Sequence, residues 1–217
     1  MSPATGRSRG PRRTSALGQL STALRLLLIM TVLLGVAYPL AMVGVGRLVA
    51  PAQADGSWVR DGSGQVVGSA LIGQSYLLAD GSPDPRYFQS RPSAAGEGYD
   101  AMSSGGSNLG PTNPELVEAI KERRAAVAVF EGVDAALVPA DAVTASSSGL
   151  DPDISPEYAA LQVPRVAKER GLEEAQVRSL VEAATERVWV VLPGQARVNV
   201  LRLNVSLDAA KPLEAVR

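Results

Sequence analysis

A run of 21 residues without a charged side chain, residues 26–46 between Arg25 and Arg47, limits the folds open to this chain more than any other feature of its sequence. As an α-helix rising ~1.5 Å per residue, the run would span roughly 30 Å, which is the thickness of the hydrocarbon core of a bilayer. The apolar core of a secretory signal peptide is shorter, at about 7–15 residues. The sequence therefore predicts a single transmembrane helix over residues 26–46 that is retained in the mature protein.

A cleaved signal peptide is the alternative interpretation of the same segment. The small residues around Gln53 resemble a cleavage site, and Arg12 with Arg13 resembles a twin-arginine pair. Under this alternative, the mature chain would begin at Asp55 and would be a free extracytoplasmic ligand-binding protein.

The charges predict an orientation in the membrane. Residues 1–46 contain five arginines and no acidic residue, whereas residues 47–217 carry 16 basic and 22 acidic residues. Basic residues that flank a membrane helix stay in the cytoplasm. We therefore expect a basic cytoplasmic tail over residues 1–25 and an acidic body outside the cytoplasm.

The composition and the missing motifs exclude several kinds of chemistry. The chain has no His and no Cys, which excludes a Ser-His-Asp triad, imidazole or thiolate metal ligands and disulfides. Phosphate-binding GxxxxGK[S/T], GxSxG, SxxK and the Asp-Lys-Thr-Gly phosphorylation loop of cation pumps are all missing. We expect no catalytic residue and no metal site. Asp151 is the one candidate for an anchored carboxylate enzyme, but acids that flank a proline more often form a turn.

The body predicts one domain of mixed helix and sheet. The Pro/Gly-rich residues 47–64 are typical of a linker, and residues 65–217 are long enough for one sizeable core. The fold class we expect is a single N-terminal transmembrane helix plus one extracytoplasmic α+β or α/β domain. Helices are predicted from Asn113-Pro114 to Gly132, from Ser155-Pro156 to Gly171 and over 173–185, and short strands at 66–67, 70–72, 142–145 and 188–192. Residues 198–207 fit a strand and a helix equally well.

Two stretches stand out because they are rich in Gly, Ser, Pro and Asn. The first covers residues 80–114, and the second covers 143–152 and is followed by Gln162. Their many hydroxyl and N–H groups are able to cradle a ligand, but they equally fit an ordered loop that satisfies its own backbone, or a surface for a partner. A Gln on an apolar helix face usually bonds to backbone. The loop and partner candidates are Tyr87, Phe88, Arg91, Pro92, Ser93, Ser107, Asn108 and Asn113.

These motifs together resemble the C subunit of the bacterial Kdp-type potassium-transporting ATPase. They run in order over about 180 residues of the chain. The matching pieces are the apolar segment ending at Tyr38-Pro39, YFQSRPSA (87–94), SGGSNLGPTN (104–113), VTAS and SGLDP within 143–152, the ISP helix start (154–156), QVPRVAKERGL (162–172) and VNVLRLN (198–204). One departure is Asp153, where the family often has His or Asn.

The resemblance implies a non-catalytic subunit of a potassium uptake complex in the bacterial plasma membrane. Its partners would be a channel-like potassium-translocating subunit, a P-type ATPase subunit and a very small helical subunit, with membrane lipid around the anchor and no nucleic acid. It also implies a catalytic chaperone that raises the ATP affinity of the pump subunit. In that role Gln162 would contact the nucleotide, with Ser146, Ser147, Ser148 and Gly149 nearby. ATP is the only ligand implied, no cofactor is covalently bound, and K+ is the ion that the complex transports.

The predicted topology conflicts with the nucleotide role. Gln162 would lie outside the cytoplasm, where ATP is scarce, and the sequence supplies no Lys-containing loop for phosphate. The residues themselves favour an assembly and stabilising role, in which the acidic body mildly concentrates cations near a pore mouth.

Overall fold

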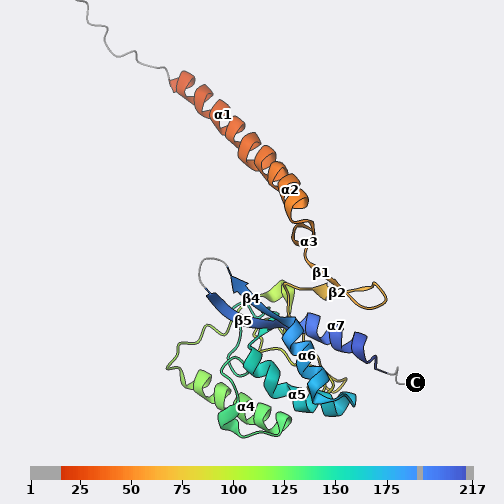
Figure 1. Ribbon diagram of the computed structural model, residues 1–217. Helices are drawn as coiled ribbons and strands as arrows, with labels where there is room; N and C mark the ends of the chain where they lie inside the picture. The colour runs from red at the N-terminus through yellow and green to blue at the C-terminus, as the bar shows by residue number, and fades with distance from the viewer. Residues whose placement is uncertain (1–15, 190–192, 214–217) are drawn as a thin grey trace, which may run out of the picture. The chain divides into compact units, whose positions relative to one another are not determined.

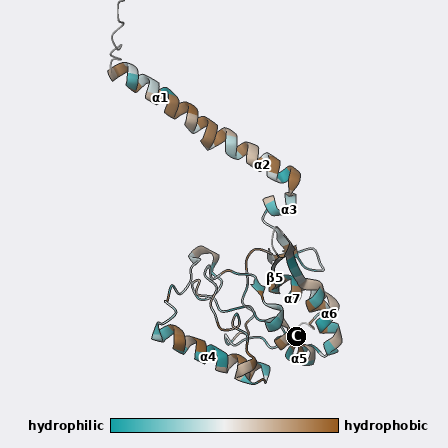
Figure 2. Ribbon diagram, turned by 60° about the vertical axis from the view of Figure 1, so that its left-hand side comes forward, coloured by the Kyte–Doolittle hydropathy of each residue, from teal (hydrophilic) through white to brown (hydrophobic). Residues whose placement is uncertain are grey.

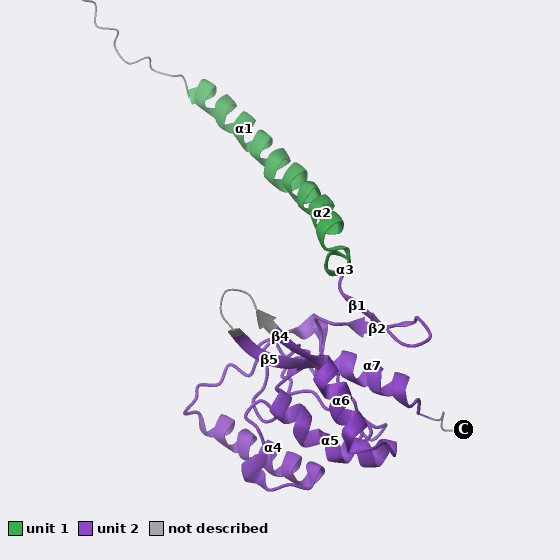
Figure 3. Ribbon diagram, in the orientation of Figure 1, with its two compact units in different colours: residues 1–55 green, residues 56–217 purple. Residues whose placement is uncertain are grey.

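A computed structural model describes residues 16–189 and 193–213. Most of the predicted basic tail (1–15) and the end of the predicted strand (190–192) lie outside the described residues. The chain divides into two compact units, residues 1–55 and 56–217 (Figure 3).

The first unit is one long helical run. It consists of α1 (Ala16–Val32), the π-helical turn η1 (Leu33–Ala37) and α2 (Tyr38–Val49), followed by the short α3 (Pro51–Ala54). The run Ala16–Val49 is 34 residues long and apolar enough to cross a membrane, as its hydropathy colouring shows (Figure 2). The wider π turn precedes Pro39, whose ring would clash with the carbonyl of Gly35 in a regular α-helix. The helix predicted from the uncharged run is therefore confirmed by its length and composition.

The second unit is built on two small antiparallel sheets. In the three-stranded sheet, β5 (Pro193–Asn199) lies between β3 (Asp153–Ile154) and β4 (Thr185–Trp189). The two-stranded sheet is a hairpin of β1 (Trp58–Arg60) and β2 (Val66–Ser69), so the segment predicted as a linker contains α3 and β1.

Over the part of the domain that the structure describes, four helices pack around these sheets or follow them in the chain. They are α4 (Pro114–Glu131), α5 (Pro156–Arg170), α6 (Glu174–Ala184) and α7 (Val200–Ala210), and short 3-10 turns lie at η2 (Ala101–Ser103) and η3 (Ala135–Leu137). In Figure 1, α5, α6 and α7 lie close to the three-stranded sheet, and each of them contacts β5. The mixed helix and sheet domain that the sequence predicts is confirmed.

The helix α5 supplies much of the core. Its residues Tyr158, Val163 and Val166 are buried, together with Phe88 from the long irregular stretch and Leu203 from α7. The predicted face carrying Tyr158, Gln162 and Val166 is therefore the face that packs inward.

Two of the predicted strands are wrong. Residues 142–145 form turns, because the backbone of Val143 and Thr144 bonds locally to Ala140 O instead of to another strand. The strand at 66–67 is confirmed, but 70–72 is a turn. The ambiguous stretch 198–207 contains both elements, because Asn199 ends β5 and its side chain accepts a hydrogen bond from Arg202 N at the start of α7.

Candidate functional site

Residues 87–99, called here the 87–99 segment, are bonded at their start to both α5 and α7. The amide of Asn204 on α7 exchanges two hydrogen bonds of 3.0 Å with the backbone N–H and C=O of Phe88. The amide of Gln162 on α5 does the same with Gln89, accepting from its N–H at 2.7 Å and donating to its C=O at 3.1 Å. Two buried side-chain amides thus replace the neighbouring strand that this extended backbone lacks.

Arg165, one turn after Gln162 on α5, bonds both to Gln162 and to the backbone just before Phe88. Its guanidinium donates to Pro85 O and Tyr87 O at 2.6 and 3.0 Å, and to Gln162 Oε1 at 2.9 Å. The Oε1 atom of Gln162 therefore accepts two hydrogen bonds, which fills both of its lone pairs. The Gln162 side chain is fully buried, so a ligand reaches it only if these bonds open.

Arg165 is neutralised by a buried carboxylate. Its Nε lies 2.9 Å from Oε2 of Glu131 at the end of α4, and the guanidinium lies 4.4 Å from the centre of the Phe130 ring. Burial raises the pKa of Glu131, and the Arg165 charge acts against that rise. This ion pair joins the end of α4 to α5.

The predicted serine stretch 146–149 is joined to the same segment. Ser146 N donates to Pro92 O at 3.0 Å, and Ser93 Oγ donates to Gly149 O at 2.6 Å. Gly149 has φ +67°, and a Cβ there would lie 2.6 Å from Ala95 Cβ. Only glycine fits this position, both for its backbone angle and for its space.

The loop that precedes α4 also contacts the 146–149 turn. Gly105 N and Ser104 Oγ both donate to Ser148 O at 2.9 Å, so this loop lies against the 146–149 turn. Asn113 caps α4 by accepting from Glu115 N, as predicted from the sequence. Ser147, Ser148, Ser107 and Asn108 remain exposed.

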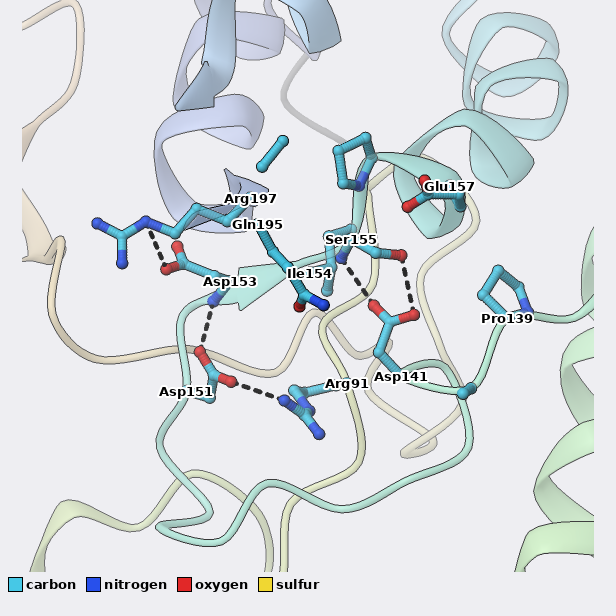
Figure 4. A pocket seen from close by; sticks show the side chains of 13 residues that line it. Arg91, Pro139, Asp141, Asp151, Asp153, Ile154, Ser155, Glu157, Gln195 and Arg197 are labelled. Atoms are coloured by element: carbon cyan, nitrogen blue, oxygen red, sulfur yellow. Dashed lines mark hydrogen bonds and ion pairs between the residues drawn. The ribbon is translucent and has the colours of Figure 1, made fainter. Parts of the chain in front are cut away.

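A groove of about 770 Å³ opens at the start of α5, and Arg91 of the 87–99 segment is among the charged side chains that line it (Figure 4). A chain of contacts runs along it: Arg91 pairs with Asp151 at 2.8 Å, Asp151 accepts from the backbone N–H of Asp153 at 3.1 Å, and Asp153 pairs with Arg197 at 3.3 Å. Burial raises the pKa of Asp153, and the Arg197 charge acts against that rise. The Asp151 carboxylate thus caps a turn and neutralises Arg91.

The groove does not favour an anion. Its lining includes four carboxylates and two arginines. The N-terminus of α5 opens onto it, but Asp141 already accepts hydrogen bonds from Ser155 N and Ser155 Oγ there, at 2.7 and 2.8 Å. The positive end of the helix is therefore occupied by a side chain of the protein itself. A second hollow of about 600 Å³ shares Arg91 and Asp151 with the groove and is lined by Ser146, Ser147 and Ser148.

Over the described ranges, no three His, Cys, Asp or Glu side chains are grouped so that they would hold a metal ion. The predicted residues have different partners: Tyr87 O bonds to Arg165 and Phe88 to Asn204, on either side of the Gln162 contact with Gln89. Pro92 and Ser93 bond to the 146–149 turn, and Arg91 pairs with Asp151. Sequence reasoning missed Asn204 and Arg165. The signal for Asn204 was an amide between Leu203 and Leu207 on an apolar helix face, where an unpaired polar group would be costly.

The family model described as K+-transporting ATPase, c chain, matches residues 20–209 of this chain. A relative from Polaromonas naphthalenivorans named potassium-transporting ATPase KdpC subunit is 52% identical over 198 residues, which cover 90% of this chain and 97% of the relative. A relative of the same name from Kineococcus radiotolerans is 51% identical over 199 residues, covering 92% and 97%. A third, from Mycobacterium bovis, is 49% identical over 191 residues, covering 88% and 97%.

Proposed function

Because the chain belongs to the KdpC family, the c chain of the K+-transporting ATPases, we propose that it is a non-catalytic subunit that assembles and stabilises a potassium uptake complex. The channel-like subunit, the P-type ATPase subunit and the small helical subunit are its partners in this proposal. The pump chemistry then belongs to another chain, which agrees with the missing Asp-Lys-Thr-Gly loop in this sequence.

The observation that carries the proposal is the set of hydrogen bonds from Gln162 and Asn204 that holds the start of the 87–99 segment, called here the clamp. Gln162 and Asn204 bind the backbone of Phe88 and Gln89, and the 146–149 turn and the 104–106 loop are bonded to one another beside it. The most polar motifs of the sequence therefore build a rigid loop cluster. The exposed Ser107, Asn108 and Ser147 on this cluster are the docking residues that we propose.

In this proposal the helix anchors the chain in the bacterial plasma membrane and the domain lies outside the cytoplasm. The support is the charge distribution, because residues 1–46 contain five arginines and no acidic residue. A body with more acidic than basic residues on that side would mildly favour K+ close to the ion entrance.

The resemblance also implies a rise in the ATP affinity of the pump subunit. We propose that the chain exerts this effect through its contacts with the partner subunits. In this account Gln162 positions the 87–99 segment, because its side chain is fully buried and bonded to Gln89 and Arg165. The groove carboxylates would also repel a triphosphate.

Co-purification tests the assembly role. A C-terminally tagged full-length chain, expressed with its partner subunits, should retain the P-type ATPase subunit in detergent. The variant Ser107→Arg with Asn108→Asp should lose it, whereas the control Ser179→Arg at an exposed position of α6 should keep it. Recovery of the tagged chain alone, or a mature N-terminus at Asp55, would contradict the proposal and support the released ligand-binding protein.

Photolabelling of the assembled complex with an azido-ATP tests the indirect route. We expect the label on the ATPase subunit. Label on this chain would show that the nucleotide touches it directly and would contradict our account of Gln162.

A further inference from the structure

The hairpin of β1 and β2 has one face packed on the domain and one face free. Gly68 sits against α7, where a Cβ would come within 2.9 Å of Leu201 Cδ2. Its cross-strand partner Val59 is half-buried on the same inner face. The inner face of the hairpin therefore packs on α7.

The outer face is apolar with one cation. Trp58 and Arg60 alternate with Val59 along β1, and Val66 lies opposite Arg60. The Trp58 side chain is 59% exposed, Val66 is 42% exposed, and Leu71 just after β2 is 62% exposed. This face therefore combines apolar groups, the indole of Trp58 and the side chain of Val66, with the charged guanidinium of Arg60.

The geometry before Trp58 is fixed. Gly56 and Ser57 have φ +101° and +53°, so the chain turns sharply there. A Cβ atom at Gly56 would lie 3.6 Å from the Trp58 ring. Ser69 Oγ donates to Gly56 O at 2.7 Å, and Ala70 N donates to Ser57 O at 2.9 Å. The turn is thus bonded to the end of β2.

Chain length allows this surface to reach the membrane. Eight residues separate Val49, the end of the apolar helical run, from Trp58, and four of them form α3. The helical turn and the four other residues reach about 25 Å at most. The headgroup layer on each side of the hydrocarbon core is itself several ångströms thick, at roughly 5–8 Å.

We infer that the outer face of this hairpin, formed by Trp58, Arg60 and Val66, rests in the headgroup layer of the bilayer on the domain's side. Tryptophan concentrates in that layer because its ring is apolar and its N–H is polar. Nη1 of Arg60 donates to Gly64 O at 2.8 Å in the hairpin turn, and its remaining N–H groups supply donors for lipid phosphate. Asp61 is held in the same turn by Ser63 and Gln65. The inference rests on the membrane anchoring in the proposed function and adds a second contact with lipid.

Tryptophan fluorescence in lipid nanodiscs tests this inference. The chain has two Trp, so the full-length variant Trp189→Phe leaves Trp58 as the only indole. Brominated acyl chains should quench Trp58 emission, and aqueous iodide should quench it weakly. A matched control replaces both Trp by Phe and adds Leu137→Trp, which places an indole at a 63% exposed position elsewhere on the domain. The control should show the reverse pattern.

A second variant, Val66→Glu in the Trp189→Phe background, places a charge on the same outer face and should reduce the quenching by brominated lipid. Far-UV circular dichroism checks that each variant is folded. If the protein co-elutes with nanodiscs but Trp58 behaves like the Leu137→Trp control, the inference is overturned while the anchor stands. Trp58 that becomes shielded only after the partner subunits are added would also overturn it and would assign the surface to a protein contact. Failure to enter nanodiscs would refute the anchor, and the inference with it.

Discussion

Gln162 on α5 and Gln89 in the 87–99 segment form a two-way contact, in which the side-chain amide accepts from the backbone N–H at 2.7 Å and donates to the backbone C=O at 3.1 Å. The two residues are 73 positions apart in the chain. Asn204 on α7 repeats the arrangement at the adjacent residue, Phe88. A long irregular segment is therefore ordered by side chains that act as the missing strand.

Removing one amide should destabilise the domain without changing its topology. Gln162→Ala leaves the half-buried N–H and C=O of Gln89 without their partner and opens a cavity at a fully buried side chain, so we expect a loss of about 2–4 kcal/mol in the free energy of unfolding. Chemical denaturation of the full chain in detergent measures it. Gln195→Ala, at an exposed position of β5, serves as the control and should change stability by less than about 0.5 kcal/mol.

Asn204→Ala should cost a similar amount. Because both amides hold one segment, the double variant should lose less than the sum of the single losses, with a coupling of about 0.5–3 kcal/mol. Additive losses would show that the two contacts are independent and would contradict the clamp.

Gly149 should tolerate no side chain. Gly149→Ala would adopt φ +67° and place its Cβ 2.7 Å from Gly105 O, so the 146–149 turn must move away from its neighbours. The matched control is Gly64→Ala, which has φ +85° but no atom within 4 Å of the new Cβ. The control should show backbone strain alone, roughly 1–3 kcal/mol, and Gly149→Ala should be clearly worse in thermal melting. Equal losses would show that the close approach to Gly105 carries no energetic weight.

Asp84 should make folding stability depend on acid. Hydrogen bonds from Arg86 hold the pKa of Asp84 below its ordinary value of 3.8, with Nη2 of Arg86 at 2.6 Å. The carboxylate therefore contributes stability that is fully present above pH 3.8 and is lost as the pH falls through the lowered pKa. Asp84→Asn should destabilise the domain at neutral pH, and its deficit should shrink in acid.

Unfolding curves of the unsubstituted chain and of the Asp84→Asn variant, recorded from acidic to neutral pH, measure the difference in their free energies of unfolding. Burial raises the pKa values of Glu131 and Asp153, which gives pH effects of the opposite sign, but these are common to both proteins and cancel in the comparison. A deficit that stays constant with pH would show that the Asp84 charge plays no part.

Local signals in the sequence predicted the helices well. Asn113-Pro114 and Ser155-Pro156 mark the starts of α4 and α5, and Gly132 and Gly171 follow their last turns in the left-handed conformation, at φ +68° and +58°. These features depend on the backbone within a few residues, so the sequence alone is sufficient.

Hydrogen bonds between residues far apart in the chain could not be predicted from the sequence. The bonds between Asn204 and Phe88 join residues 116 positions apart, and no local pattern specifies them. Residues 142–145 have strand-like side chains but lie in turns, where Val143 N and Thr144 N bond to Ala140 O and not to a neighbouring strand. The role of Gln162 could be predicted only as a general tendency of buried amides to bind backbone.

Cysteine labelling of intact spheroplasts decides whether the domain lies on the outer side of the membrane, which our account of this accessory subunit requires. The chain has no native Cys, so a single engineered thiol gives a signal without background. Ser179→Cys lies at an exposed position of α6, and Ser8→Cys lies in the predicted cytoplasmic tail. A membrane-impermeant maleimide should label Ser179→Cys in intact spheroplasts and label Ser8→Cys only after permeabilisation. The opposite pattern would place the domain in the cytoplasm and contradict the account.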